Sequence, residues 1–164
     1  MPAADGSVDL VWCRDVLVHI DQLAKAYREF RRVLRPGGRA LVYQMFSTAR
    51  LEPVEADWIL LTLGCAAPSM RPEYAEAAMT AAGLRIDQCI ILRSEWGEYA
   101  QERSGATGRQ LLHAARLLRD PARYIQRFGQ ANYNVALADS LWHIYRMIGK
   151  LSGRVYLLTA PDAG

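Results

Sequence analysis

The sequence has no apolar run long enough to cross a membrane. A bilayer-spanning helix needs about 20 consecutive apolar residues, and the stretch from Trp58 to Ala67 is interrupted by Thr62 and Gly64. The first six residues, Met1 to Gly6, have neither the basic region nor the apolar core of an export signal. We therefore expect a cytoplasmic protein with no membrane partner.

Cysteine is also scarce, and its pattern argues against two kinds of stabilising site. The three cysteines, Cys13, Cys65 and Cys89, are odd in number, lie far apart and form no CxxC pair. This pattern indicates neither a disulfide framework nor a zinc site. We interpret all three as small buried hydrophobic residues and predict no metal site.

Lysine is nearly absent. The net charge of +3 comes from a basic set that contains only two lysines, Lys25 and Lys150. The densest arginine cluster, Arg28 with Arg31 and Arg32, lies on the polar side of a predicted helix, and Glu29 sits among its members. A solvated helix face is favoured over a phosphate-binding patch, so we expect no nucleic-acid partner.

The composition that remains is that of one ordinary globular domain. The chain has 164 residues, of which 51% are hydrophobic and 23% charged, and its mean hydropathy is −0.06. A chain of this length buries roughly 70% of its unfolded surface on folding. It therefore needs no metal or disulfide to hold its core.

The first third of the sequence predicts a strand, a helix and a second strand. Residues 7–13 form a short apolar run after the turn signal Asp5-Gly6, which is typical of a buried parallel strand. Asp21 is a suitable N-cap for a helix that stops at residues 35–38, and residues 39–46 form the next strand. The apolar stripe of that helix is Leu23, Tyr27, Phe30 and Leu34. This crossover unit is the building block of doubly wound α/β folds.

The rest of the chain predicts further helices and two more strands. We expect helices from Pro53 to before Gly64 and over 72–82, a strand over 84–93, a helical segment over 105–150 and a last strand over 154–159. The helical segment has two predicted apolar stripes: Leu111, Leu112, Ala115 and Leu118 in the first, and Tyr133, Leu137, Leu141, Tyr145 and Ile148 in the second.

Two stretches carry a family resemblance. The first is residues 5–20, DGSVDLVWCRDVLVHI, and the second is residues 28–39, REFRRVLRPGGR. At this separation, and followed by a helix ending in AAGL at 81–84, they resemble class I S-adenosylmethionine-dependent methyltransferases, in the branch with the type 11 small-molecule domain. The resemblance implies S-adenosylmethionine as cofactor and a small-molecule methyl acceptor as partner.

The resemblance covers only the second half of the family's domain. The family's sheet order is 3-2-1-4-5-7-6, and its cofactor lies on a glycine-rich turn after the first strand. No GxGxG follows a strand in this sequence, and the segment 105–108, GATG, has no apolar strand leading into it. We therefore interpret residues 1–164 as one partial domain: an α/β, Rossmann-like sheet of family strands four to seven, with a helical insertion over 105–150 and the cofactor half absent.

The candidate catalytic residues follow the first strand. Methyl transfer needs an aligned nucleophile and a group that takes its proton. The resemblance implies that Asp15 faces substrate and cofactor, while the alternative is that it caps the following turn. His19, four residues later and on the same side of a predicted helical turn, could remove a proton or only bond the backbone.

Other residues are candidates for binding. The resemblance implies that Trp12, Cys13 and Arg14 lie near the cofactor, although a core or surface role is an alternative for each. Tyr43 and Gln44 end the second strand, where substrate could bind. Gln44 stands where several N-methylating relatives have an acidic residue, which weakens the case for a cationic amine.

A second group of candidates follows the third strand. Glu95, Trp96 and Tyr99 combine a carboxylate with aromatic rings, which suits a cation or a polyol. The alternative is an ordinary polar loop. In the family, an insertion such as the one over 105–150 often forms a lid over the substrate.

Two functions remain open from the sequence. The first is a small-molecule N- or O-methyltransferase, of which this chain is a truncated form that is inactive alone. The second is a non-catalytic binding module or one half of a two-chain assembly. Without the earlier strands, residues 7–13 would form an exposed edge, which favours a homodimer, aggregation or a partner that supplies the missing sheet.

Overall fold

The computed structural model describes residues 2–161, and these residues form two compact units. The sheet unit comprises residues 2–46, 65–91 and 153–161, and the helical unit comprises residues 47–64 and 92–152. Each unit has its own hydrophobic cluster. The sheet unit contains the segments that carry the family resemblance.

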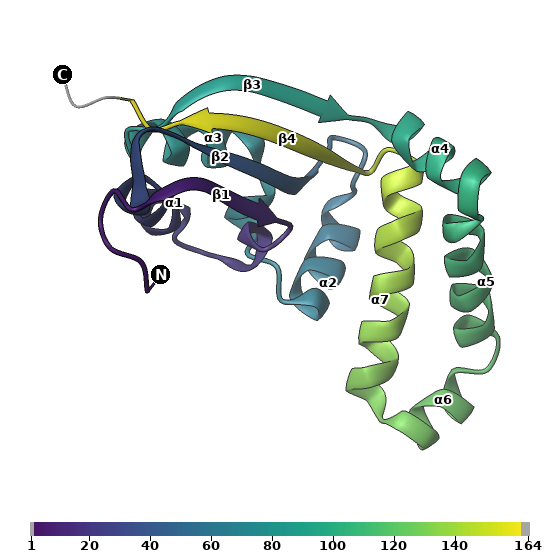
Figure 1. Cartoon of the computed structure of the whole chain (residues 1–164). Coiled ribbons are helices and arrows are strands. Elements are labelled where there is room, and N and C mark those ends of the chain that lie inside the picture. Colours follow the sequence, from purple (N-terminus) through teal and green to yellow (C-terminus); the bar gives the residue numbers. More distant parts are fainter. Residues whose placement is uncertain (1, 162–164) are drawn as a thin grey trace. The chain divides into compact units, whose positions relative to one another are not determined.

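Four strands form a single sheet, as the α/β prediction required. They are β1 (Val8–Arg14), β2 (Leu34–Ser47), β3 (Arg85–Leu92) and β4 (Leu151–Thr159). Their spatial order is β1-β2-β4-β3, so β1 lies at one edge (Figure 1). Both the existence of these strands and the exposed edge of β1 were predicted from the sequence.

The pairing of β1 with β2 confirms the predicted crossover. The two strands are parallel, and their register runs from Leu10 opposite Arg39 to Arg14 opposite Tyr43. Parallel neighbours need a connection that returns over the sheet, and helix α1 (Leu23–Val33) provides it. The carboxyl ends of β1 and β2 therefore lie side by side.

The helices of the sheet unit lie on one side of its sheet. Helices α1 and α3 (Pro72–Ala81) contact each other, and the short 3-10 helices η1 (Leu17–His19) and η2 (Ala67–Met70) contact each other as well. The core between helices and sheet includes Tyr27, Met79 and Leu158, all fully buried. This arrangement fixes which strand residues become buried.

The prediction of a buried strand over residues 7–13 holds for one face of β1 only. Val11 and Cys13 face the core, whereas Leu10 and Trp12 are 55% and 64% exposed. Successive strand residues point to opposite faces, and no described helix of the sheet unit covers the second face (Figure 1). The strand therefore keeps an apolar, open face.

The junction between α1 and β2 differs in detail from its prediction. The helix is preceded by Gln22 rather than Asp21 as its N-cap, and the Asp21 carbonyl instead accepts a hydrogen bond from Tyr74. Leu34, predicted as the last residue of the helical stripe, is the buried first residue of β2. Gly37 has φ of 71°, so the predicted glycine turn is present, inside the extended segment.

The helical unit contains five helices among the described residues. They are α2 (Pro53–Leu63), α4 (Ser94–Ser104), α5 (Ala106–Arg119), α6 (Pro121–Phe128) and α7 (Gln130–Met147). Helices α5 and α7 pack along each other, and α6 connects them (Figure 1). The predicted helical segment is thus confirmed, and its breaks fall at Asp120 and Gly129.

The predicted buried stripe of α5 is wrong. Leu111, Leu112 and Leu118 are 55%, 57% and 59% exposed, and Ala115 is exposed too, while Ala114 and Leu117 are buried. The core-facing side of the helix thus lies about one residue away from the expected stripe. In α7 the stripe is closer to prediction, because Tyr133 and Leu137 are buried, although Ile148, just beyond the helix, is exposed.

The cysteines differ in burial. Cys13 is buried, Cys65 is half-buried and Cys89 is exposed. The prediction of three buried thiols is therefore wrong for Cys89, because β3 presents most of its residues to solvent. None of the described helices is long and apolar enough to cross a membrane.

Candidate functional site

A cavity of about 520 Å³ lies between β1 and α1 in the sheet unit. Its volume is within the usual range for small-molecule sites. The walls are mostly apolar and come from β1, the segment after it and one side of α1. They are formed by Val11, Trp12, Cys13, Arg14, Val16, Leu17, Ile20, Ala26, Glu29 and Phe30.

The three residues predicted to bind cofactor line this cavity. Trp12, Cys13 and Arg14 are the last three residues of β1. Ligands of open α/β sheets bind beyond the carboxyl ends of strands, which is where these residues lie. Burial raises the pKa of the Cys13 thiol, so Cys13 contributes an uncharged, apolar surface to the wall.

Asp15 follows directly, in a conformation that non-glycine residues rarely adopt. Its φ is 54°, in the left-handed region, and its amide donates a 2.8 Å hydrogen bond to the carbonyl of Tyr43. Asp and Asn tolerate this region better than other residues. This hydrogen bond joins the carboxyl ends of β1 and β2 and holds the backbone of Asp15 in its left-handed conformation.

The carboxylate of Asp15 lies near the two less exposed thiols of the sheet unit. Burial, together with a smaller contribution from the negative charge of Asp15, raises the pKa of Cys65 to about 11. The same charge adds to the effect of burial on Cys13. Asp15 thus places a negative charge at the carboxyl end of β1.

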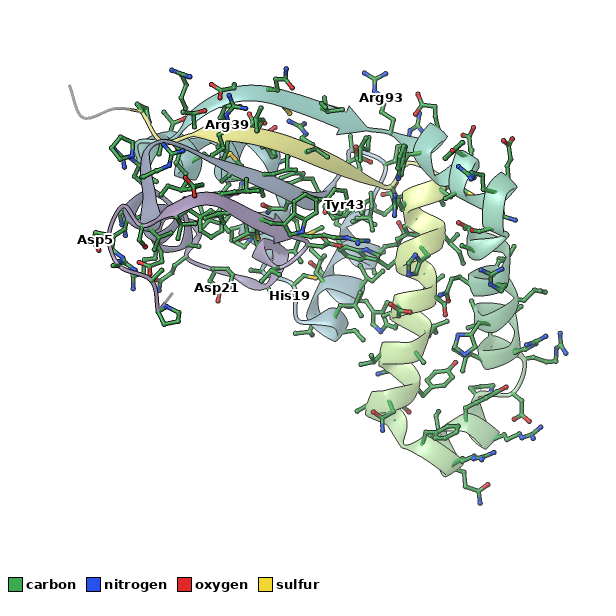
Figure 2. The ribbon with its side chains drawn as sticks, in the orientation of Figure 1. Asp5, His19, Asp21, Arg39, Tyr43 and Arg93 are labelled. Carbon is green, nitrogen blue, oxygen red and sulfur yellow. The ribbon has the colours of Figure 1, made fainter. Side chains whose placement is uncertain are left out.

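His19 is exposed at the end of η1, which is a single 3-10 turn. η1 spans only Leu17–His19, and its N-cap is Val16, so Asp15 lies just before the turn rather than within it. The placement of Asp15 and His19 on one side of the turn stays a prediction. Figure 2 shows His19 on the segment after β1, toward the same end of the sheet unit as Tyr43.

Tyr43 lies beside the main chain of β4. It is half-buried, and a Cβ added to Gly153 would come within 2.9 Å of its ring. Only glycine leaves room for the ring at this position. Gly153 therefore helps to position a predicted substrate residue, and the sequence analysis did not single it out.

Gln44 is placed differently from its prediction. Its side chain is 0% exposed, its Nε2 donates to the carbonyl of Ser69 at 2.7 Å, and its Oε1 accepts from Tyr27 at 3.4 Å. The Ser69 hydroxyl in turn donates to the carbonyl of Ile20 at 2.6 Å. These partners give Gln44 a structural role inside the sheet unit, and nothing around it supports substrate binding.

The sequence analysis missed the contribution of α1 to the cavity. Ala26, Glu29 and Phe30 line it, and their spacing of three and four residues is the signal that could have identified them. Arg32 binds Glu29 through two hydrogen bonds of 2.8 and 2.6 Å and lowers the pKa of that carboxyl to about 2. Glu29 therefore stays ionised at the wall.

The remaining predicted substrate residues lie in the helical unit. Glu95, Trp96 and Tyr99 are in α4, so the predicted polar loop is wrong at this segment. The rings of Trp96 and Tyr99 are 5.8 Å apart, and both side chains are about half exposed. The guanidinium of Arg103 lies 5.5 Å from the Tyr99 ring centre and occupies one side of that ring.

Within residues 2–161, no three acidic, cysteine or histidine side chains gather in a geometry that could hold a metal.

Parts of the sequence are similar to methyltransferases. Residues 1–42 match the family described as methyltransferase domain. Over 38 residues the chain is 47% identical to dimethylglycine N-methyltransferase of Parasynechococcus marenigrum, and over 54 residues it is 35% identical to methyltransferase GfsG of Streptomyces halstedii. These matches cover 23% and 33% of this chain, and 14% and 19% of the two relatives.

Solved structures extend the likeness to nearly the whole chain. A geranyl diphosphate methyltransferase in complex with SAM has a TM-score of 0.63 at 15% identity, and covers 98% of this chain and 54% of its own. The chain has the α/β fold of the matching part of that structure. It spans about half the length of that structure and 35% of Haemonchus contortus phosphoethanolamine N-methyltransferase 2, which matches with a TM-score of 0.61 at 16% identity over 98% of this chain.

This methyltransferase fold also supports other chemistry. The [4+2]-cyclase SpnF matches with a TM-score of 0.69 at 21% identity, and covers 99% of this chain and 54% of its own. The reaction must therefore be argued from the residues of the site rather than from the fold.

Proposed function

We propose that this chain forms the substrate-side half of an S-adenosylmethionine-dependent methyltransferase. The enzyme would methylate a nitrogen or oxygen atom of a small molecule. The observation that carries the proposal is the cavity at the carboxyl end of β1. Its walls include Trp12, Cys13 and Arg14, and these residues belong to the segment 1–42 that matches the methyltransferase domain.

The cavity walls fit one side of such a cofactor. They are mainly apolar, they include the indole of Trp12, and the ionised Glu29 is their acidic group. Rings and thioether chains suit apolar walls, while polar atoms need a few placed partners. S-adenosylmethionine supplies an activated methyl group on a sulfonium; Trp12, Cys13 and Arg14 are the residues that would hold it.

The chain's own contribution to the reaction is alignment and proton removal. The chain would hold the acceptor's lone pair in line with the methyl group that the bound cofactor would supply. The acceptor must then lose a proton, and we assign this role to Asp15 or His19. Asp15 is held rigidly by its bond to Tyr43, while exposed His19 can exchange the proton with solvent.

Substrate recognition is assigned to residues of both units, each on its own evidence. In the sheet unit, Tyr43 offers a ring and a hydroxyl beside Gly153. In the helical unit, Glu95, Trp96 and Tyr99 offer a carboxylate and a pair of aromatic rings. The helical segment 105–150 would serve as a lid, as the resemblance implies.

The half-domain interpretation is supported by strand order. The order β1-β2-β4-β3 equals the last four strands, 4-5-7-6, of the family's sheet. The open edge of β1 and its exposed Leu10 and Trp12 are where the first three strands and their helices would pack. A cofactor site in this family needs that first half, so we expect the chain to be inactive alone.

The open edge also predicts association. A strand with unpaired backbone groups and apolar neighbours pairs with other strands. We expect the isolated chain to form a homodimer through β1, to aggregate, or to require the missing sheet. Light scattering tests this directly, and a stable monomer at high concentration would contradict it.

The activity test uses a version extended at its N-terminus by the reading frame upstream of Met1. We expect that extension to supply a strand followed by a GxGxG turn, and the extended protein to methylate an amine or hydroxyl acceptor. Asp15→Asn and His19→Gln separate the two proton acceptors, with exposed Asp21→Asn as the control. An upstream frame without such a strand and turn, or unchanged turnover in both variants, would contradict the proposal.

One observation favours a second candidate function. β1 is an edge strand whose second face is uncovered in the described chain. The chain could therefore be a binding module, or one half of a two-chain assembly, without catalysis of its own. Cofactor binding by the chain only after a separate partner is added would favour this alternative.

A further inference from the structure

The helical unit contains a segment whose strong positive charge has no role in the proposed function. Between residues 106 and 138 there are five arginines and one acidic residue, Asp120, a net charge of +4. The whole chain carries +3, so the remaining residues together are slightly acidic. The one acidic side chain caps α6 by accepting from the amide of Arg123.

On α5 the charges share one side of the helix with an exposed leucine. Arg109, Leu112, Arg116 and Arg119 are spaced by three, four and three residues, which places them along a single stripe. All four are exposed. The opposite side of the helix, which includes Ala114 and Leu117, packs toward α7 and is buried.

Helix α6 repeats this combination at the end of the helical unit (Figure 1). None of its residues is fully buried. Arg123 and Arg127 lie one turn apart, and the guanidinium of Arg127 is 5.1 Å from the ring centre of Phe128, which is 51% exposed. Leu118, at the end of α5, is exposed as well.

We propose that the outer surface of α5 and α6 binds the surface of a bilayer that contains anionic lipids. Arginines would contact the headgroups, and Leu112 and Phe128 would insert among the upper acyl carbons. Basic helices with exposed leucine and phenylalanine bind membranes in this way. The absence of a spanning segment does not oppose surface binding, which needs none.

The positive charge and the exposed apolar side chains of this surface favour a bilayer over a second copy of the chain or a nucleic acid. A second copy would bring a net charge of +4 against +4, and this repulsion opposes self-association through these helices. Nucleic acid would use the arginines but would leave the exposed leucines in water. An anionic bilayer matches both the charge and the apolar side chains. The proposal does not depend on the proposed methyltransferase function.

The test measures co-flotation of the full chain with vesicles. One set contains phosphatidylcholine with one third phosphatidylglycerol, and the other contains phosphatidylcholine alone. We expect binding to the anionic vesicles only, weakened by salt. The triple variant R116Q/R119Q/R123Q should lower the partition coefficient by about fivefold per arginine, and L112S/F128S by about tenfold or more.

A matched control tests whether binding depends on this surface or on exposed arginines and leucines anywhere in the chain. R28Q/R71Q/L61S removes two exposed arginines and an exposed leucine elsewhere in the chain, and circular dichroism checks that every variant is folded. Equal loss in the control variant, equal binding to uncharged vesicles, or no vesicle binding would overturn the proposal. So would tight binding to heparin or DNA that L112S/F128S leaves unchanged while vesicle binding is absent.

Discussion

The sheet unit and the helical unit bury their apolar residues to different extents. The sheet unit has a continuous cluster that joins β1, β2, β4, α1 and α3. In the helical unit, one cluster joins four buried residues of α5 and α7, Ala114, Leu117, Tyr133 and Leu137, and several partly buried residues pack against them. Three leucines of α5 stay in solvent.

This difference explains why the apolar stripes predicted from the sequence agree better with the buried residues in the sheet unit than in the helical unit. In the sheet unit, strand and helix periodicities meet in a single core, so each apolar stripe has a partner surface. In the helical unit, three leucines of α5 are exposed, and periodicity alone does not tell which stripe of that helix faces α7. Apolar residues left over at such a surface are a signal of binding rather than of folding.

The largest expected effect is on core packing. Leu158→Ala in the sheet unit should lower the free energy of unfolding by about 2–5 kcal/mol, because Leu158 is fully buried in the larger cluster. Leu117→Ala should cost less within that range, since its small cluster can relax around the cavity. Leu112→Ala, at an exposed site, should change stability by less than about 0.5 kcal/mol. Urea unfolding measures all three.

A reversed order, with Leu117→Ala as costly as Leu158→Ala or more so, would contradict the difference between the two cores. A large cost for Leu112→Ala would show that α5 is packed on its solvent-facing side.

The next effect concerns buried polar groups. Gln44→Ala should cost about 1–3 kcal/mol, because it leaves the carbonyl of Ser69 without its donor inside the sheet unit. The counterpart in the helical unit is Ser140, whose hydroxyl bonds the carbonyl of Ala136 and the ring of His113. Ser140→Ala should cost less, since His113 is exposed and can bond water. Thermal unfolding compares the two variants.

If Gln44→Ala left stability unchanged but weakened acceptor binding in an extended protein, the structural role would be wrong and the original substrate prediction right.

The smallest effect is electrostatic. In the helical unit, Lys150 binds both carboxylate oxygens of Glu55 and holds the pKa of that carboxyl below its ordinary value. A carboxyl with a lowered folded-state pKa stabilises the protein above its unfolded pKa, and this stability is lost as pH falls through the folded pKa. Lys150→Met should therefore destabilise at neutral pH, and its difference from the original chain should shrink below about pH 4.

Unfolding curves across this pH range measure the effect. A difference between Lys150→Met and the original chain that stayed constant down to strongly acidic pH would show that the pair contributes by packing rather than by charge.

The sequence predicted the α/β class, the four strands and the edge position of β1. These features depend on local signals such as the apolar run before Asp15 and the glycine turn at Gly37, and on short connections that leave few topologies. It did not predict which face of β1 is covered, because the apolar run alone does not tell on which side of the sheet α1 and α3 pack. Nor did it predict that Glu95 and Trp96 lie in a helix.

The candidate site was predicted from a resemblance more than from physics. Trp12, Cys13 and Arg14 do line a cavity, but the burial of Gln44 and the left-handed backbone of Asp15 depend on long-range contacts with Ser69 and Tyr43. No local pattern encodes those contacts. The helical spacing of Glu29 could have placed it in the cavity wall. It was not predicted there because a charged residue next to Arg32 is typical of a solvent-exposed helix face.

The central claim is that the described cavity is one wall of a cofactor site. It is tested most directly by calorimetric titration of S-adenosylhomocysteine into this chain and into the version extended through the upstream reading frame. We predict binding by the extended protein alone, weakened when Trp12 is replaced by Ala. Binding by the short chain as a monomer, or no binding by a folded extended protein, would contradict the account.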